Sequence, residues 1–186
     1  VAVVGLCLAT YGPDMPPWLT LCDFHSNRIT GDPINAYTSN VLLDVDFLRE
    51  HRIAFRNELG QTGGEDTIFF REIDRAGGSI VYCPEAIVHE RVTPSRANMT
   101  WVRRRKFRAG QTHGLMCREF FPGKYRMLLA TAGAKALASF LVALLSLPGS
   151  VRARNWEGRG FLHLGAVAYR LKPQILKEYG GAKNRQ

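Results

Sequence analysis

The chain has 186 residues, 46% of them apolar and 22% charged, and a formal net charge of +9. This length suits one domain with its own hydrophobic core, and the apolar content excludes an intrinsically disordered protein. The 4 cysteines are widely spaced and form no Cys-x-x-Cys pair, which argues against a zinc site and against a disulfide framework.

The charge is distributed unevenly along the chain. Residues 1–98 contain 8 Lys and Arg against 13 Asp and Glu, whereas residues 99–186 contain 17 against 3. The second half is strongly basic, so we expect it to face an anionic partner. Phospholipid headgroups, nucleic acid and a pyrophosphate-bearing ligand are the candidates.

Strand and helix signals alternate in the first third of the chain. Residues 1–8 form an apolar run typical of a buried strand, and residues 28–37 predict a loop. The apolar residues 41–43 lead into a predicted helix that starts near Asp44, a good N-cap residue, and ends before Phe55.

The same alternation continues after a loop at residues 61–64. We expect a helix over residues 65–76, ended by the glycines at 77 and 78, then a strand over residues 79–83 and a second one over 86–88. A further helix is predicted from about Asn98 to His113. Alternating strands and helices indicate an α/β sheet flanked by helices.

Residues 127–147 are the most apolar stretch, and about 20 such residues can cross a bilayer. Lys135 lies near its middle and makes spanning costly, by roughly 3 kcal/mol. A re-entrant or interfacial helix, a true span and a core helix all stay open. The basic residues flanking the stretch favour anionic lipid in the first two cases: Lys124, Arg126, Arg152 and Arg154.

The sharpest motif is Gly63-Gly64-Glu65-Asp66. Two glycines let the backbone approach a ligand closely, and two carboxylates follow in the first turn of the predicted helix. A carboxylate at such a junction can accept a proton from a bound hydroxyl. Ordinary capping by acidic residues is the alternative, because Asp and Glu are common in first helical turns.

Three other patterns accompany this motif within residues 1–115: Thr38-Ser39-Asn40, Pro84-Glu85-Ala86 and the Arg-rich segment Trp101–Gly110. Together they resemble the acceptor-side half of family 2 glycosyltransferases, in particular bacterial exopolysaccharide enzymes of the succinoglycan type. The resemblance implies a partial GT-A fold, with a Rossmann-like mixed sheet flanked by helices, over residues 1–123. Residues 124–186 are expected to form a basic, apolar, helical region that associates with the membrane.

The resemblance also implies an inverting sugar transfer at the cytoplasmic face of the cell membrane. The donor would be a nucleotide sugar and the acceptor a glycan or a lipid-linked glycan. Asp66 would be the catalytic base, and Glu65 would orient the acceptor or Asp66 itself. The predicted acceptor-binding residues are small or polar: Thr38, Ser39, Asn40, Gly63 and Gly64. Turn formation is an equally good explanation of the first three.

Enzymes that this chain resembles bind Mg²⁺ or Mn²⁺ through an Asp-x-Asp motif at the end of a strand. Asp44-Val45-Asp46 fits superficially, but it lies where the family begins an acceptor-side helix, so we interpret it as N-cap chemistry. The main metal ligands are therefore expected upstream of residue 1. His89 is a candidate additional ligand, with a purely structural role as the alternative.

A basic cluster marks the predicted helix after residue 98. Trp101, Arg104, Arg105 and Arg108 fall on one side of that helix. Guanidinium groups suit bidentate phosphate contacts, so we predict a pyrophosphate or lipid-phosphate site, with a solvated basic face as the alternative.

Two other classes of function compete with a transferase. One is a basic module that binds nucleic acid or a membrane without catalysis, and the other is a membrane-associated fragment that is inert without its donor-binding half. No nucleic-acid-binding signature is recognisable and aromatics are not interleaved through the basic stretch, so no nucleic-acid partner is expected.

Overall fold

The computed structural model describes residues 1–28 and 36–177, and the chain divides into two compact units. The first unit consists of Val1–Gly12 and His25–Val92, and the second of Pro13–Phe24 and Thr93–Gln186. The loop predicted at residues 28–37 lies almost entirely outside the described residues. The division predicted between residues 123 and 124 stays a prediction.

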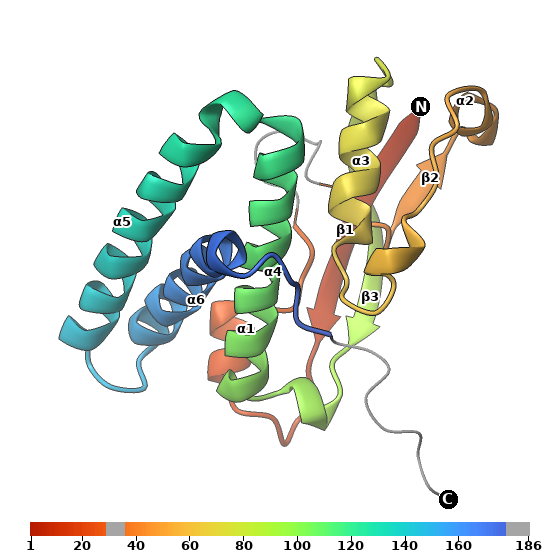
Figure 1. Cartoon of the computed structure of the whole chain (residues 1–186). Helices are drawn as coiled ribbons and strands as arrows, with labels where there is room; N and C mark the ends of the chain where they lie inside the picture. Colours follow the sequence, from red (N-terminus) through yellow and green to blue (C-terminus); the bar gives the residue numbers. More distant parts are fainter. Residues whose placement is uncertain (29–35, 178–186) are drawn as a thin grey trace, which may run out of the picture. The chain divides into compact units, whose positions relative to one another are not determined.

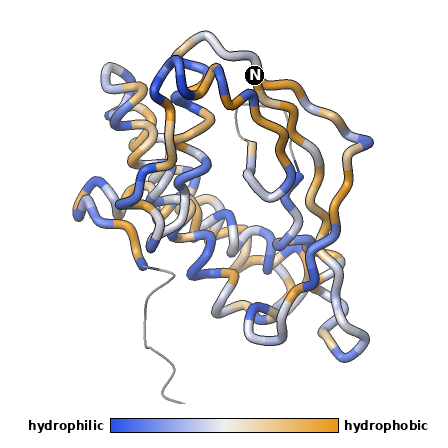
Figure 2. Tube along the Cα trace, turned by 90° about the vertical axis from the view of Figure 1, so that its right-hand side faces the viewer, coloured by the Kyte–Doolittle hydropathy of each residue, from blue (hydrophilic) through white to orange (hydrophobic). Residues whose placement is uncertain are grey.

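The first unit is built on a mixed sheet. Its strands within the described residues are β1 (Ala2–Thr10), β2 (Val41–Leu43) and β3 (Ile80–Arg91), in the order β2-β1-β3. Strand β2 runs antiparallel to β1, and β3 runs parallel to it. The chain leaving the N terminus is coloured as hydrophobic in Figure 2, in keeping with its central place in the sheet. The predicted mixed α/β architecture is confirmed at this level.

Strand β3 corrects one expectation, because a single strand replaces the two predicted at residues 79–83 and 86–88. Its pairing with β1 is irregular: Val4 lies opposite Tyr82, whereas Leu6 lies opposite Ile87. The extra residues of β3 include Pro84, which has no N–H to donate to a ladder and is tolerated at such irregularities.

Helix α3 (Glu65–Arg75) covers one face of this sheet (Figure 1). The hydrophobic core of the unit joins buried side chains of the helix to those of β1: Phe69, Phe70 and Ile73 with Ala2 and Val4. Each large apolar side chain buried in this way contributes about 1.5–3 kcal/mol. Helix α3 ends as predicted before Gly77, whose φ of +81° suits glycine.

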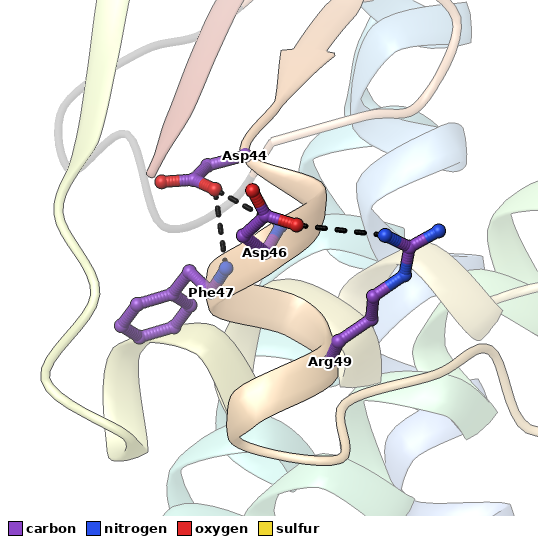
Figure 3. Close-up of polar contacts among 4 residues, drawn as sticks. All are labelled: Asp44, Asp46, Phe47 and Arg49. Carbon is purple, nitrogen blue, oxygen red and sulfur yellow. Dashed lines mark hydrogen bonds and ion pairs between the residues drawn. The ribbon is translucent and has the colours of Figure 1, made fainter.

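Two short elements complete the first unit: α2 (Val45–Glu50) and the 3₁₀ helix η2 (Asn57–Leu59). The N-cap predicted for the first of these is confirmed. Asp44 Oδ1 accepts hydrogen bonds from the backbone N–H groups of Asp46 and Phe47, both at 3.1 Å (Figure 3).

All the named secondary-structure elements in the described residues of the second unit are helices. Its elements are α1 (Trp18–Cys22), η3 (Pro94–Arg96), α4 (Met99–Phe120), η4 (Pro122–Lys124), α5 (Tyr125–Leu145) and α6 (Val151–Leu171). Helix α6 packs against both α4 and α5 (Figure 1).

Helix α4 begins where the sequence predicts, since the side chain of Asn98 accepts a hydrogen bond from the Trp101 backbone N–H at 2.9 Å. It runs on to Phe120, although we expected it to end near His113. The reason is tertiary. Gly114 does not end the helix, because it faces α6, where a Cβ would lie 3.0 Å from Cβ of Tyr169.

Helix α5 coincides with the apolar stretch predicted at residues 127–147. The helical segment Pro122–Leu145 is long and apolar enough to cross a membrane, with a mean hydropathy of 1.9, and 17% of its most apolar stretch is buried. The buried residues of α5 are Ala132, Ala136 and Ser139. So little burial disfavours the core-helix alternative, because a core helix hides most of its apolar side chains.

Candidate active site

The candidate site lies in the first unit, where a loop turns into α3. Gly63 and Gly64 have φ angles of +72° and +91°, which side chains rarely permit. The Gly63 N–H donates to the Leu59 carbonyl oxygen at 2.8 Å. Gly64 is the N-cap of α3, and it has no side chain that could accept hydrogen bonds from the free N–H groups of the first helical turn. The two glycines therefore place Glu65 and Asp66 in the first turn.

Asp66 is partly buried and held by the backbone. Its Oδ1 accepts a hydrogen bond from the Thr67 N–H at 3.0 Å, and the N–H groups of Thr38 and of Asp66 itself also donate to the carboxylate. Burial raises the pKa of Asp66, and the charge of Glu65 raises it further, while these N–H groups act in the opposite direction. A fixed carboxylate with a raised pKa is suited to accept a proton.

Glu65 carries a second feature that points to a ligand. Its Oε2 atom is buried and has no hydrogen-bond partner among the described residues. A buried acceptor left without a donor costs about 1–3 kcal/mol. A hydroxyl group bound beside Glu65 would remove that cost, as the predicted orienting role requires.

The structure separates the roles of the three predicted acceptor-binding residues that precede β2. Thr38 reaches Asp66 through its backbone N–H. The Ser39 hydroxyl accepts a hydrogen bond from the side-chain amide of Asn27 at 3.1 Å. Sequence reasoning considered the Thr38 side chain only, because no local pattern reveals a backbone contact between residues 28 positions apart.

Asn40 is used within the sheet. Its amide nitrogen donates to the carbonyl oxygens of Leu6 and Ala86, each at 2.9 Å, and so bridges β1 and β3 at their irregular pairing. Gly5 makes room for this bridge, since a Cβ there would collide with both the Ala86 carbonyl and the Asn40 amide. These two bonds use both amide hydrogens of Asn40. Only its side-chain carbonyl oxygen is left to contact an acceptor glycan.

The potential metal-ligating side chains are scattered among the described residues. No group of three or more His, Cys, Asp and Glu that could hold a metal ion occurs within residues 1–28 and 36–177. His89 is exposed on β3, opposite Leu8. Asp44 caps α2, and Asp46 pairs with Arg49 at 3.5 Å (Figure 3). The expected Mg²⁺ or Mn²⁺ stays a prediction for residues outside this set.

The predicted phosphate-binding residues lie on α4, in the second unit. The guanidinium of Arg105 lies over the Trp101 ring, 5.1 Å from its centroid. Arg104 donates to the carbonyl oxygen of Lys177 at 2.8 Å, and Arg108 is partly buried. Arg104 and Arg105 are therefore engaged within the protein, and the role of all three arginines toward phosphate stays a prediction.

Sequence reasoning missed the basic face of α6. Arg152, Trp156 and Arg159 stand at positions i, i+4 and i+7, which places them on one side of a helix. All three line a single cavity of the second unit. Their spacing is the sequence signal for this basic face. It was overlooked because the apolar and basic composition of the segment indicated only membrane association.

Comparison with known proteins supports the resemblance to succinoglycan-type proteins that the motifs predict. The chain is similar to the succinoglycan biosynthesis protein ExoM of Rhizobium meliloti, with 38% identity over 183 residues, or 96% of this chain. The chain spans 59% of the length of that relative. No family model matches the chain, and no solved structure matches it.

Proposed function

We propose that this chain is the acceptor-side part of an inverting family 2 glycosyltransferase of the GT-A type that acts in bacterial exopolysaccharide synthesis. The observation that carries the proposal is the Asp66 carboxylate, partly buried, oriented by backbone N–H groups and raised in pKa at a glycine-rich loop. The similarity to a succinoglycan biosynthesis protein favours this chemistry over ordinary capping.

In the proposed reaction, Asp66 accepts the proton of an acceptor hydroxyl while that oxygen forms a bond to the anomeric carbon of the donor sugar. The bond between the anomeric carbon and the nucleoside diphosphate breaks, and the diphosphate leaves with the electron pair. A single displacement inverts the anomeric configuration. Glu65 accepts a hydrogen bond from the acceptor through Oε2, the atom that has no partner among the described residues.

The proposed acceptor is a polysaccharide or a lipid-linked glycan, and the proposed place is the cytoplasmic face of the cell membrane. Two observations support a membrane-bound acceptor. Helix α5 exposes leucines in its C-terminal half, from Leu137 to Leu145, and residues 99–186 carry 17 Lys and Arg against 3 Asp and Glu. Apolar surface beside positive charge favours anionic lipid.

The test is sugar transfer by the longest reading frame that contains this chain. A panel of nucleotide sugars with Mg²⁺ or Mn²⁺ is offered with membrane extract, and Asp66→Asn is compared with the wild type. Loss of the base is expected to slow transfer by about 10²–10⁴-fold. Asp74→Asn is the matched control, because Asp74 is exposed on the same helix.

The pH dependence gives a second readout. Because the base acts only when ionised, transfer should rise with pH through the raised pKa of Asp66. The folded protein holds this proton more tightly than the unfolded chain, so stability falls as pH rises between the ordinary and the raised pKa. Asp66→Asn should therefore fold normally at neutral pH. Wild-type rates in the folded variant would refute the assignment.

A further inference from the structure

The second unit contains a cavity of about 520 Å³ that the proposed transfer reaction does not use. Its wall is formed by α6, by Lys106 of α4, by the last residue of α1 and by the two residues that follow it. A volume of this size is typical of small-molecule sites, which span about 300–1,000 Å³. We call it the basic cavity, after the cations that line it: Lys106, Arg152 and Arg159.

Positive charge dominates this wall. Three cationic side chains line it against one carboxylate, that of Asp23. Glu157, which lies on α6, is paired elsewhere, since its Oε1 accepts a hydrogen bond from Arg103 Nε at 2.8 Å. The basic cavity therefore has an excess of positive charge that an anion would neutralise.

Among these cations, Lys106 has the charge that its surroundings stabilise least. Its ammonium nitrogen lies 5.7 Å from the centroid of the Phe24 ring. Burial lowers the pKa of Lys106, and the neighbouring charge of Arg105 lowers it further. Among the described residues no carboxylate forms an ion pair with Lys106. A partly buried ammonium without a counter-charge is costly, and a bound anion would offset that cost.

The cavity also offers aromatic surface. Phe24 and Trp156 line it, and the Arg159 guanidinium lies 5.0 Å from the centroid of the Trp156 ring. Gly158 keeps the space open, because a Cβ at that position would lie 3.2 Å from the Phe24 ring. Aromatic walls beside fixed cations suit a ligand with an anionic head and an apolar or planar body.

We propose that the basic cavity binds a phosphate or diphosphate ester, with the phosphate held by Lys106, Arg152 and Arg159 and the rest of the ligand against Phe24 and Trp156. This site lies on residues other than the α4 arginines that the sequence predicted. It is independent of Asp66 and of the proposed transfer reaction. The phosphate belongs either to a soluble nucleotide or to a lipid, and binding measurements distinguish the two.

The experiment measures binding to the full 186-residue chain in mild detergent. Inorganic pyrophosphate and ADP are titrated by calorimetry, and sedimentation is measured with phosphatidylcholine vesicles that contain phosphatidic acid. Lys106→Gln and Arg159→Gln are each expected to weaken binding by roughly tenfold or more, because each removes a charge-assisted contact. Lys106→Gln also removes a partly buried charge that no carboxylate neutralises, so we expect this variant to fold.

Arg170→Gln is the matched control, since Arg170 is an exposed cation on the same helix and does not line the cavity. Binding of ADP or pyrophosphate that is lost in the cavity variants and kept in the control assigns a soluble ligand. The same pattern with phosphatidic acid vesicles only assigns a lipid phosphate. Equal binding by all three variants, or no binding of any probe by the folded wild type, would overturn the proposal.

Discussion

The contact between α4 and α6 leads to the sharpest stability prediction, for the substitution Gly165→Ala. A Cβ at Gly165 would collide with the backbone carbonyl oxygen of Phe107 and would lie 2.8 Å from its carbonyl carbon. The relation is reciprocal, since a Cβ at Gly110 would collide with the carbonyl oxygen of Leu162. The two helices therefore touch backbone to backbone, as small residues permit.

The size of the destabilisation depends on whether the atoms that the new Cβ meets can move away. Overpacking costs about 1–3 kcal/mol, and the upper end applies because a backbone carbonyl cannot rotate away as a side chain can. Alanine is the better helix former by about 1 kcal/mol, which offsets part of the cost. The net loss in the free energy of unfolding of the second unit is therefore about 2 kcal/mol.

Tryptophan fluorescence in urea measures this unit by itself. The chain has 3 tryptophans, Trp18, Trp101 and Trp156, and all of them belong to the second unit. With a slope of roughly 2 kcal/mol per molar urea, the loss should lower the unfolding midpoint by about 1 M.

Gly133→Ala is the control for helix propensity. Gly133 lies inside α5, and a Cβ there would meet nothing within 4 Å. This variant should raise the midpoint, by up to about 0.5 M on the same slope, because it gains propensity without a clash. A midpoint for Gly165→Ala equal to or above the wild type would refute the close packing of α4 and α6.

Two further predictions concern the sheet and the apolar helix. Asn40→Ala removes two hydrogen bonds worth about 1 kcal/mol each, so the protected amides of β1 should exchange with solvent roughly 30-fold faster. Unchanged exchange together with weaker acceptor binding would instead show a purely ligand-binding role for Asn40. Leu137 and Leu144 are 74% and 80% exposed on α5. The double variant Leu137→Asp and Leu144→Asp should therefore partition less into vesicles, at a cost of roughly 3 kcal/mol per site. Its urea midpoint should equal that of the wild type, because both positions are on the surface. Unchanged partition would contradict membrane contact through α5.

Local chemistry made several features predictable from the sequence. The cap at Asp44 and the start of a helix near Asn98 depend only on a side chain and the N–H groups two or three residues further on. The turn before α3 was recognisable because only glycine readily adopts the positive φ of positions 63 and 64. The apolar run at residues 127–147 likewise identified α5 by composition alone.

The candidate site was only half predictable. The pair Glu65 and Asp66 stood out by position, but the sequence does not reveal how the carboxylates are held. The raised pKa of Asp66 depends on burial, and its orientation depends on the Thr38 N–H, which arrives from another segment. Asn40 was expected at the acceptor, whereas the irregular pairing of β1 with β3 uses both of its amide hydrogens.

By itself, then, the sequence determined where most helices and strands begin and which carboxylates stand at a helix start, because those features depend on neighbours along the chain. Tertiary structure decided the rest. It joined two predicted strands into β3, carried α4 past His113, and brought Lys106 and Arg159 to the wall of one cavity. Each of these depends on contacts between distant segments, where the close approach of backbones at glycines and the loss of solvent at charged groups outweigh local preference.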